Sequence, residues 1–157
     1  MVEAKKAALI AVPCVAGVGA GLFYFLKSRQ KVITATIDPP EGRFCETWYT
    51  VMVKITDGFG NPLANQPFKV RTYLDGIMVG ETDNIAGTPC VTDSSGTFMW
   101  LMGWESAEGA PMEHQEVDES HVFFIEVIAD GAIGKSNEAI FTIVACTDKP
   151  CKLPPPS

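Results

Sequence analysis

Histidine is scarce in this chain, and the short motifs of common catalytic sites are missing. Only His114 and His121 occur among the 157 residues. The sequence has no G-x-S-x-G elbow, no H-E-x-x-H zinc motif, no glycine-rich phosphate loop, and no Cys and His spaced as a nucleophile pair. Scattered Ser, His and Asp residues carry no weight on their own. The sequence therefore predicts a protein that is not an enzyme and that needs no cofactor.

Basic residues are few beyond the N-terminal region. Residues 32–157 hold seven Lys and Arg against eighteen Asp and Glu, a formal charge of −11, whereas residues 1–31 hold five basic residues against Glu3, a charge of +4. An acidic surface repels the phosphates of nucleic acids and of anionic lipids. We therefore expect no nucleic-acid partner, and solubility is the default meaning of the acidic charge.

Helical periodicity is absent after residue 31. Instead, short apolar or alternating segments are separated by Gly, Pro, Asn and Asp, which predicts about seven strands. They cover residues 31–37, 47–55, 68–74, 77–80, 121–128 and 138–145, together with a hairpin whose arms, 90–92 and 96–102, meet across the turn 93–96. This pattern is typical of an all-β, immunoglobulin-like antiparallel sandwich, with an open barrel as the alternative.

Alternation along these strands predicts which side chains form the core. In residues 47–55, the face of Tyr49, Val51, Val53 and Ile55 points inward, and the opposite face is more polar. The dipeptide Asp75-Gly76 predicts a type I′ hairpin. The residues expected to be buried are Val51, Val53, Phe68, Val70, Phe123, Ile125 and Ile143.

One long hydrophobic run stands out against the acidic remainder. Ala7 to Leu26 contains twenty residues without a charge. Basic residues flank it on both sides: Lys5 and Lys6 before it, and Lys27, Arg29 and Lys31 after it. Near its second boundary lie Phe23, Tyr24 and Phe25, where aromatic rings tend to settle at a membrane interface. A helix of that length reaches about 30 Å, the thickness of the hydrocarbon core of a bilayer. A cleaved signal peptide and a buried helix are the two weaker readings, because the run is long and apolar on every face.

The chain thus divides into three parts. Residues 1–31 are the predicted transmembrane anchor with basic flanks, 32–146 the sandwich domain, and 147–157 a Cys/Pro-rich tail. Within the anchor, Gly17 and Gly21 form a G-x-x-x-G pair, which predicts a helix face that packs closely on another membrane helix. The alternative is a chance occurrence of small residues.

Four cysteines follow the anchor: Cys45, Cys90, Cys146 and Cys151. An even number in a membrane-tethered domain predicts two disulfides in an oxidising compartment, with three connectivities open. We favour Cys146 with Cys151 and Cys45 with Cys90. The basic residues that flank the anchor do not decide its orientation, so the cysteines do: residues 1–6 are expected inside and the domain outside the cytoplasm.

The longest insertion, residues 103–120, is strongly acidic. Its candidate partner-binding residues are Glu105, Glu108, Glu113, Glu116, Asp118 and Glu119. This density of carboxylates favours a cationic partner, and a solvated loop is the plain alternative. Weaker still is a metal site from His114, Glu116, Asp118 and His121, or a calcium site from Asp75, Asp83, Asn84 and Asp93.

Two segments carry a resemblance to a known family. The stretch DGFGNPLANQPFKV at residues 57–70, followed by TDSSGT at residues 92–97, resembles the bacterial immunoglobulin-like domains of invasin and intimin. The resemblance covers roughly residues 47–145. It implies an immunoglobulin-like fold and a non-enzymatic role as a spacer, an adhesin segment or a subunit of a surface filament or virion.

Three hypotheses for function follow. The first is a single-pass membrane protein that displays an immunoglobulin-like domain on a cell or virion surface or within a membrane-associated assembly. Its partners are then the lipid bilayer and other proteins of that assembly. One alternative is an adhesin or receptor-type binding module, which recognises an external ligand through loops such as 56–66 and 103–120. The other is an accessory single-pass subunit of a membrane enzyme complex.

Overall fold

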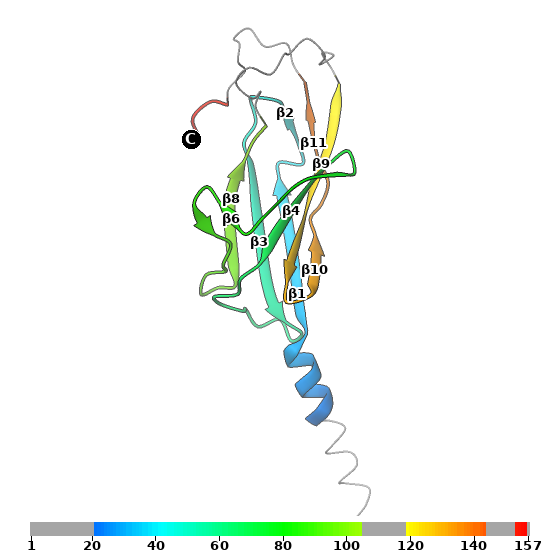
Figure 1. Ribbon diagram of the computed structural model, residues 1–157, viewed down its shortest axis with the longest axis vertical. Helices are drawn as coiled ribbons and strands as arrows, with labels where there is room; N and C mark the ends of the chain where they lie inside the picture. The colour runs from blue at the N-terminus through cyan, green and yellow to red at the C-terminus, as the bar shows by residue number, and fades with distance from the viewer. Residues whose placement is uncertain (1–20, 105–118, 144–152, 157) are drawn as a thin grey trace, which may run out of the picture.

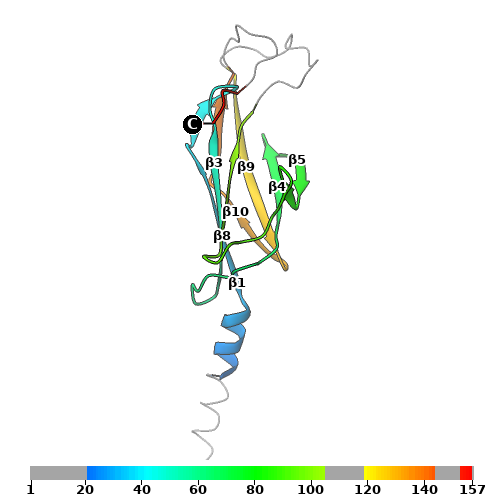
Figure 2. The ribbon, with the colours of Figure 1, turned by 90° about the vertical axis from the view of Figure 1, so that its left-hand side faces the viewer.

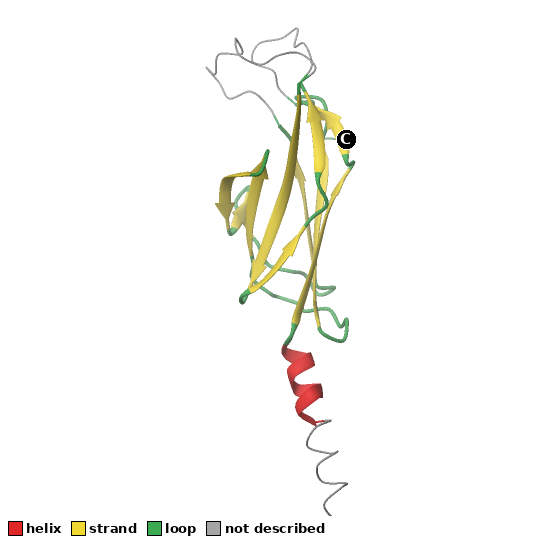
Figure 3. Cartoon of the chain, turned by 90° about the vertical axis from the view of Figure 1, so that its right-hand side faces the viewer, coloured by secondary structure: helices red, strands yellow, loops and turns green. Residues whose placement is uncertain are grey.

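The computed structural model describes residues 21–104, 119–143 and 153–156, and these residues are mostly β (Figure 1, Figure 3). Residues 21–29 form a helix. The strands are β1 (Lys31–Asp38), β2 (Glu41–Arg43), β3 (Tyr49–Asp57), β4 (Lys69–Leu74), β5 (Ile77–Thr82), β6 (Asn84–Ile85), β7 (Thr88–Pro89), β8 (Thr97–Met102), β9 (Ser120–Ala129), β10 (Ala132–Lys135) and β11 (Ala139–Thr142).

The predicted membrane anchor, residues 7–26, lies mostly outside the described residues, which include only its end from residue 21 onward. Within the described ranges, no helix has both the length and the apolar character needed to cross a membrane.

The strands form two main sheets. One has the order β1-β3-β8, and the other has the order β2-β11-β9-β4-β5, with β10 also paired to β9. In Figure 2 the β4–β5 arm stands to one side of β3 and β8. All these pairings are antiparallel except the short parallel pair of β2 and β11. The predicted all-β sandwich is therefore confirmed at the level of architecture.

The core lies between the sheets, where the sequence placed it. On one face of β3, the four alternate residues from Tyr49 to Ile55 are fully buried, whereas Met52 and Lys54 on the opposite face are exposed. The seven residues expected to be inward are all buried: Val51, Val53, Phe68, Val70, Phe123, Ile125 and Ile143. A shift by one residue would have inverted both faces, so the predicted register of these strands is confirmed.

Tight hairpins set the pairing in the larger sheet. Asp75 and Gly76 have φ of 48° and 78° between the paired residues Leu74 and Ile77, so the predicted type I′ turn is confirmed. Asp130 and Gly131 repeat this geometry between β9 and β10. The sequence analysis treated residues 129–137 only as a connection, and therefore missed β10.

The predicted hairpin over residues 90–102 is wrong in its pairing. The turn itself forms, because the amide of Gly96 donates to the carbonyl of Asp93 over 3.1 Å. However, β8 pairs with β3, and the preceding arm bonds the 63–67 segment instead. The hydroxyl of Thr92 donates to the carbonyl oxygen of Leu63 over 2.6 Å and accepts from the amide of Gln66 over 2.9 Å. These bonds hold the arm away from β8.

Candidate functional site

The helix leaves the sandwich along its long axis with an apolar surface exposed. Five consecutive large residues, Leu22, Phe23, Tyr24, Phe25 and Leu26, are each 49–65% exposed. A helix that packed one face against the sandwich would bury an apolar stripe and leave the rest polar. Here neighbouring positions all round the helix remain uncovered by the described residues.

Basic side chains follow this apolar surface. The ammonium of Lys27 lies 5.6 Å from the ring centroid of Phe23, and the guanidinium of Arg29 lies 4.3 Å from that of Phe25. Cations near ring faces gain a modest electrostatic attraction. The helix therefore ends in a belt of aromatic rings with cations beside it.

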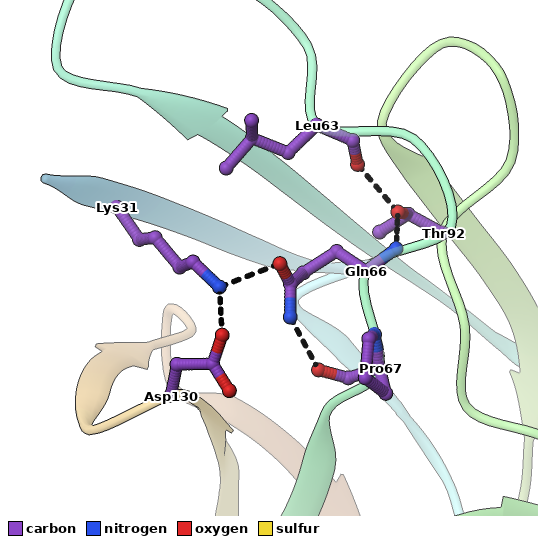
Figure 4. A network of polar contacts seen from close by, with 6 residues as sticks. All are labelled: Lys31, Leu63, Gln66, Pro67, Thr92 and Asp130. Carbon is purple, nitrogen blue, oxygen red and sulfur yellow. Dashed lines mark hydrogen bonds and ion pairs between the residues drawn. The ribbon is translucent and has the colours of Figure 1, made fainter. Parts of the chain in front are cut away.

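The connection between helix and sandwich is short. Gln30 alone separates the helix from β1, and its amide still bonds the carbonyl of Leu26 over 3.2 Å. At the next position, the Lys31 ammonium pairs with the carboxylate of Asp130 and bonds the side-chain oxygen of Gln66 over 2.5 Å (Figure 4). The first residue of β1 is thus fixed to loops of both sheets.

The polar network around Lys31 continues into the domain. Gln66 donates from its side-chain amide to the carbonyl of Pro67 over 3.0 Å, and its backbone amide bonds Thr92 (Figure 4). The ammonium of Lys31 lowers the pKa of Asp130 below its ordinary value, first through the hydrogen bond and then through charge attraction. The pair joins the first residue of β1 to the turn between β9 and β10.

A loop of the domain also contacts the helix. We name residues 57–62, which begin at the last residue of β3, the junction loop. The amide of Gly58 donates to the carbonyl oxygen of Lys27 over 3.1 Å, and the rings of Phe59 and Tyr24 lie 4.8 Å apart. The helix end, the Lys31 network and the junction loop together form the candidate site, at the end of the sandwich that joins the helix (Figure 1).

The sequence analysis found only part of this site. It predicted Phe23, Tyr24 and Phe25 as residues near a membrane boundary and Lys31 as part of the basic flank. It considered loop 56–66 only as a surface for an external ligand, and it assigned no role to Asp130. A single aromatic residue, Phe59, between Gly58 and Gly60 in a polar loop was the available signal. The other helix candidate, Gly21, has open space around the position of a Cβ, and Gly17 lies outside the described residues.

The opposite, distal end of the sandwich holds the flanks of the acidic insertion. β8 ends there at Met102 in one sheet, and β9 begins there at Ser120 in the other (Figure 1). Glu105, Glu108, Glu113, Glu116 and Asp118 lie outside the described residues. The sixth candidate acid, Glu119, has an Oε2 atom 4.0 Å from Nε2 of His121.

His121 has a hydrogen-bond partner among the described residues. Its Nδ1 lies 2.7 Å from Oδ2 of Asp75, and Oδ1 of Asp75 accepts from the amide of Val122 over 2.9 Å. Both bonds lower the pKa of Asp75, the His121 bond most. Among the described residues no group of three acidic, His or Cys side chains forms a metal site, so Asp75, Asp83 and Asp93 do not gather as the calcium hypothesis required. His114, Glu116 and Asp118 fall outside those residues.

The predicted disulfide between Cys45 and Cys90 is absent, and Cys90 is a buried free thiol. Burial, and then the charge of Asp83, raises the pKa of this thiol. The other predicted pair, Cys146 with Cys151, lies outside the described residues.

Cys45 and Cys90 do not form a disulfide because they lie beside opposite ends of β9. The residue before Cys45 bonds Thr142, which pairs with Ser120 at the start of β9. Cys90 accepts from the amide of Phe68, just before the position of β4 that pairs with Ile128. At about 3.4 Å per residue, the eight steps along β9 from Ser120 to Ile128 span about 27 Å. Disulfides need Cα atoms within about 7 Å.

The described part of the C-terminal tail packs on the distal end. The indole nitrogen of Trp48 donates to the carbonyl oxygen of Pro154 over 2.6 Å. Leu153 occupies the space beside Gly103, where a Cβ would collide with its side chain. Residues 153–156 have no regular structure. The tail and the ends of the insertion therefore share one end of the domain, away from the helix.

Comparisons with known proteins give no family. No family model matches the chain, and no curated protein matches it significantly. Among solved structures, the CARDB domain of the PF1109 protein from Pyrococcus furiosus, in complex with di-metal ions, is 13% identical with a TM-score of 0.44, and the match covers 73% of this chain and 94% of that one.

Two further structures are similar at the same level. A domain of the outer membrane lipoprotein Omp28 from Porphyromonas gingivalis is 18% identical with a TM-score of 0.33, over 74% of this chain and 97% of that one. The N-terminal domain of the Streptococcus gordonii adhesin Sgo0707 is 12% identical with a TM-score of 0.32, over 75% and 33%. At TM-scores below 0.5 these likenesses carry no inference about this chain, whose sandwich is defined by its own two sheets.

Proposed function

We propose that this chain is a non-enzymatic, single-pass membrane protein that displays an immunoglobulin-like sandwich outside the cytoplasm, on a cell or virion surface or within a membrane-associated assembly. Residues 7–26 span the bilayer in this proposal, and residues 1–6 stay inside. The lipid bilayer and other proteins of the assembly are the partners.

The observation that carries the proposal is the exposed apolar end of the helix. Full burial of a large apolar side chain is worth about 1.5–3 kcal/mol. The exposure of five adjacent large side chains, Leu22 to Leu26, to water is therefore unfavourable. The surface continues the uncharged run that begins at Ala7 and ends beside Lys27 and Arg29. Lipid is the environment that suits a helix with apolar residues on every face.

Membrane extraction tests the anchor. We expect the full-length chain to stay in the membrane pellet at alkaline pH in carbonate and to be released by detergent. The matched control replaces Val12 and Val15 by Glu, since each charge near the centre of the segment costs about 2.5–3.5 kcal/mol of insertion free energy. That variant should appear in the carbonate supernatant. Release of the unmodified chain by carbonate alone would contradict the proposal.

The acidic insertion gives this display protein its contact surface in the proposal. β8 ends before the insertion and β9 begins after it, and both of these strand ends lie at the distal end of the sandwich, away from the helix. The six carboxylates steer a cationic partner there.

Shortening the insertion tests its role. Replacing residues 106–118 by a short Gly/Ser linker should leave the thermal unfolding midpoint nearly unchanged but reduce co-purification of partner proteins from native membranes. A second variant keeps the length and changes Glu108, Glu113, Glu116 and Asp118 to the corresponding amides. Both variants should lose the salt dependence of co-purification, because salt screens exposed charges beyond about 10 Å at 0.1 M. Unchanged recovery and salt dependence in both would show that the insertion is inert.

A further inference from the structure

The junction loop is built as a rigid support for one exposed aromatic ring. Oδ1 of Asp57 accepts from the amides of Phe59 and Asn61, each over 2.9 Å, and Oδ2 accepts from the side-chain amide of Asn61. The amide of Gly60 donates to the carbonyl of Asp57 over 3.0 Å. These bonds hold the ring of Phe59 at the tip of the loop, where it remains 40% exposed.

The same loop is fixed to the helix rather than only close to it. The Gly58 amide bonds the carbonyl of Lys27, and a Cβ at Gly58 would collide with that carbonyl. The ring of Phe59 lies 4.8 Å from that of Tyr24 and 5.6 Å from the ammonium of Lys27. The position of Phe59 along the helix axis is therefore set by Tyr24 and Lys27.

This position coincides with the end of the apolar run. Tyr24 stands two residues before Leu26, so along the helix it lies about 3 Å inside the boundary of the segment. In a bilayer that residues 7–26 span, this is the level at which amphipathic rings settle, with Lys27 and Arg29 next to the headgroup phosphates. Phe59, in contact with Tyr24, reaches the same level from the sandwich.

We propose that the junction loop is a second membrane contact, with Phe59 inserted into the bilayer interface beside the helix. This inference rests on the proposed function, because it takes the helix as the membrane anchor. The ring adds apolar area to the belt of Phe23, Tyr24 and Phe25, and Lys27 lies between two rings, Phe23 and Phe59. The carboxylate of Asp57 faces the backbone of its own loop, where hydrogen bonds lower its pKa.

Two points of contact orient the domain. A helix alone permits the sandwich to lean in any direction, whereas a helix and a loop tip at one level restrict the tilt. The Lys31–Asp130 pair and the single connecting residue Gln30 transmit this restriction to β1. The ten residues of β9, at about 3.4 Å each, then hold the distal end about 34 Å beyond the junction. The described residues at both ends of the acidic insertion then lie away from the lipid surface.

Quenching of tryptophan fluorescence by lipid tests this contact. The full-length chain with Phe59→Trp is reconstituted into phosphatidylcholine vesicles, with and without lipid brominated near the headgroup end of the acyl chains. The chain has three native tryptophans: Trp100 in β8, Trp48 just before β3 and Trp104 just after β8. The unmodified chain therefore gives the background fluorescence. The matched control is Ile77→Trp, an exposed position beside the distal Asp75-Gly76 turn.

We expect brominated lipid to quench most of the emission that Phe59→Trp adds, and to leave that of Ile77→Trp unchanged. Suppose that the vesicles retain the protein through carbonate washing and yet show equal, weak quenching of the Phe59→Trp and Ile77→Trp emissions. That result would contradict the loop contact but not the membrane anchor. Another outcome is that the emission of Phe59→Trp is shielded from a water-soluble quencher in native membranes but not in pure lipid vesicles. In that case a neighbouring protein covers the loop, and the inference is wrong. If carbonate releases the protein from the vesicles, the proposed function itself fails.

Discussion

Truncation of Phe123 to alanine should lower the free energy of unfolding of residues 31–157 by roughly 3–5 kcal/mol, the usual cost for a fully buried phenylalanine. The side chain has no exposed surface. Its ring lies 4.9 Å from that of Tyr49, edge to face, and 5.5 Å from that of Trp104, so its removal leaves a cavity among rings. Urea denaturation followed by tryptophan fluorescence measures the loss.

Phe124→Ala is the matched control, because it removes the same side chain one residue further along β9. The ring of Phe124 stacks on that of Tyr73 at 4.6 Å on the other face of the sheet, where it is only half-buried. We expect a loss well below that of Phe123→Ala. Equal losses, or a loss under about 1 kcal/mol for Phe123→Ala, would mean that the register of β9 is wrong by one residue.

A second large effect is expected at Gly96, where both the backbone and the surroundings exclude a side chain. Its φ is +72°, a left-handed conformation that costs residues with a Cβ about 1–2 kcal/mol. A Cβ would also lie 2.7 Å from the carbonyl oxygen of Ile55 and 2.9 Å from the Cβ of Pro62. Gly96→Ala should therefore lower the free energy of unfolding by more than the conformational cost alone. It should also disturb the hydrogen bond that the amide of Ile55 donates to the carbonyl oxygen of Gly96.

Gly87→Ala separates the two contributions to the Gly96 effect. Gly87 has φ of +86° but no atom within 4 Å of the position of a Cβ, so this variant carries only the conformational cost. The difference between the two urea midpoints reports the collision at Gly96. Equal midpoints would contradict the close packing of the 93–96 turn against β3 and Pro62.

Local patterns predicted most strands but not their partners. Alternation in residues 49–55 predicted the buried face of β3, and Asp75-Gly76 predicted a hairpin, because both depend on neighbouring residues. The pairing of residues 90–92 failed because the Thr92 hydroxyl bonds Leu63 and Gln66, which are 29 and 26 residues away. Such bonds arise from the tertiary fold, and no short pattern reveals them.

The same limit applies to the cysteines and to the junction. Cys45 and Cys90 suggested a long-range disulfide, yet they lie beside opposite ends of β9, which the spacing of cysteines does not encode. The aromatic boundary of the helix was readable from Phe23 to Phe25. The contribution of Phe59 was not, since its proximity to Tyr24 depends on how β3 ends beside the helix.

Site-specific proteolysis of the full-length chain tests the proposed topology most directly. A recognition sequence for a sequence-specific protease is inserted after Gly109 in one version and after Glu3 in the other, and the protease is added to intact cells. We predict cleavage after Gly109 without permeabilisation and cleavage after Glu3 only once the membrane is dissolved. Protection of the Gly109 site in intact cells, with cleavage of both sites after detergent, would contradict display of the sandwich outside the cytoplasm.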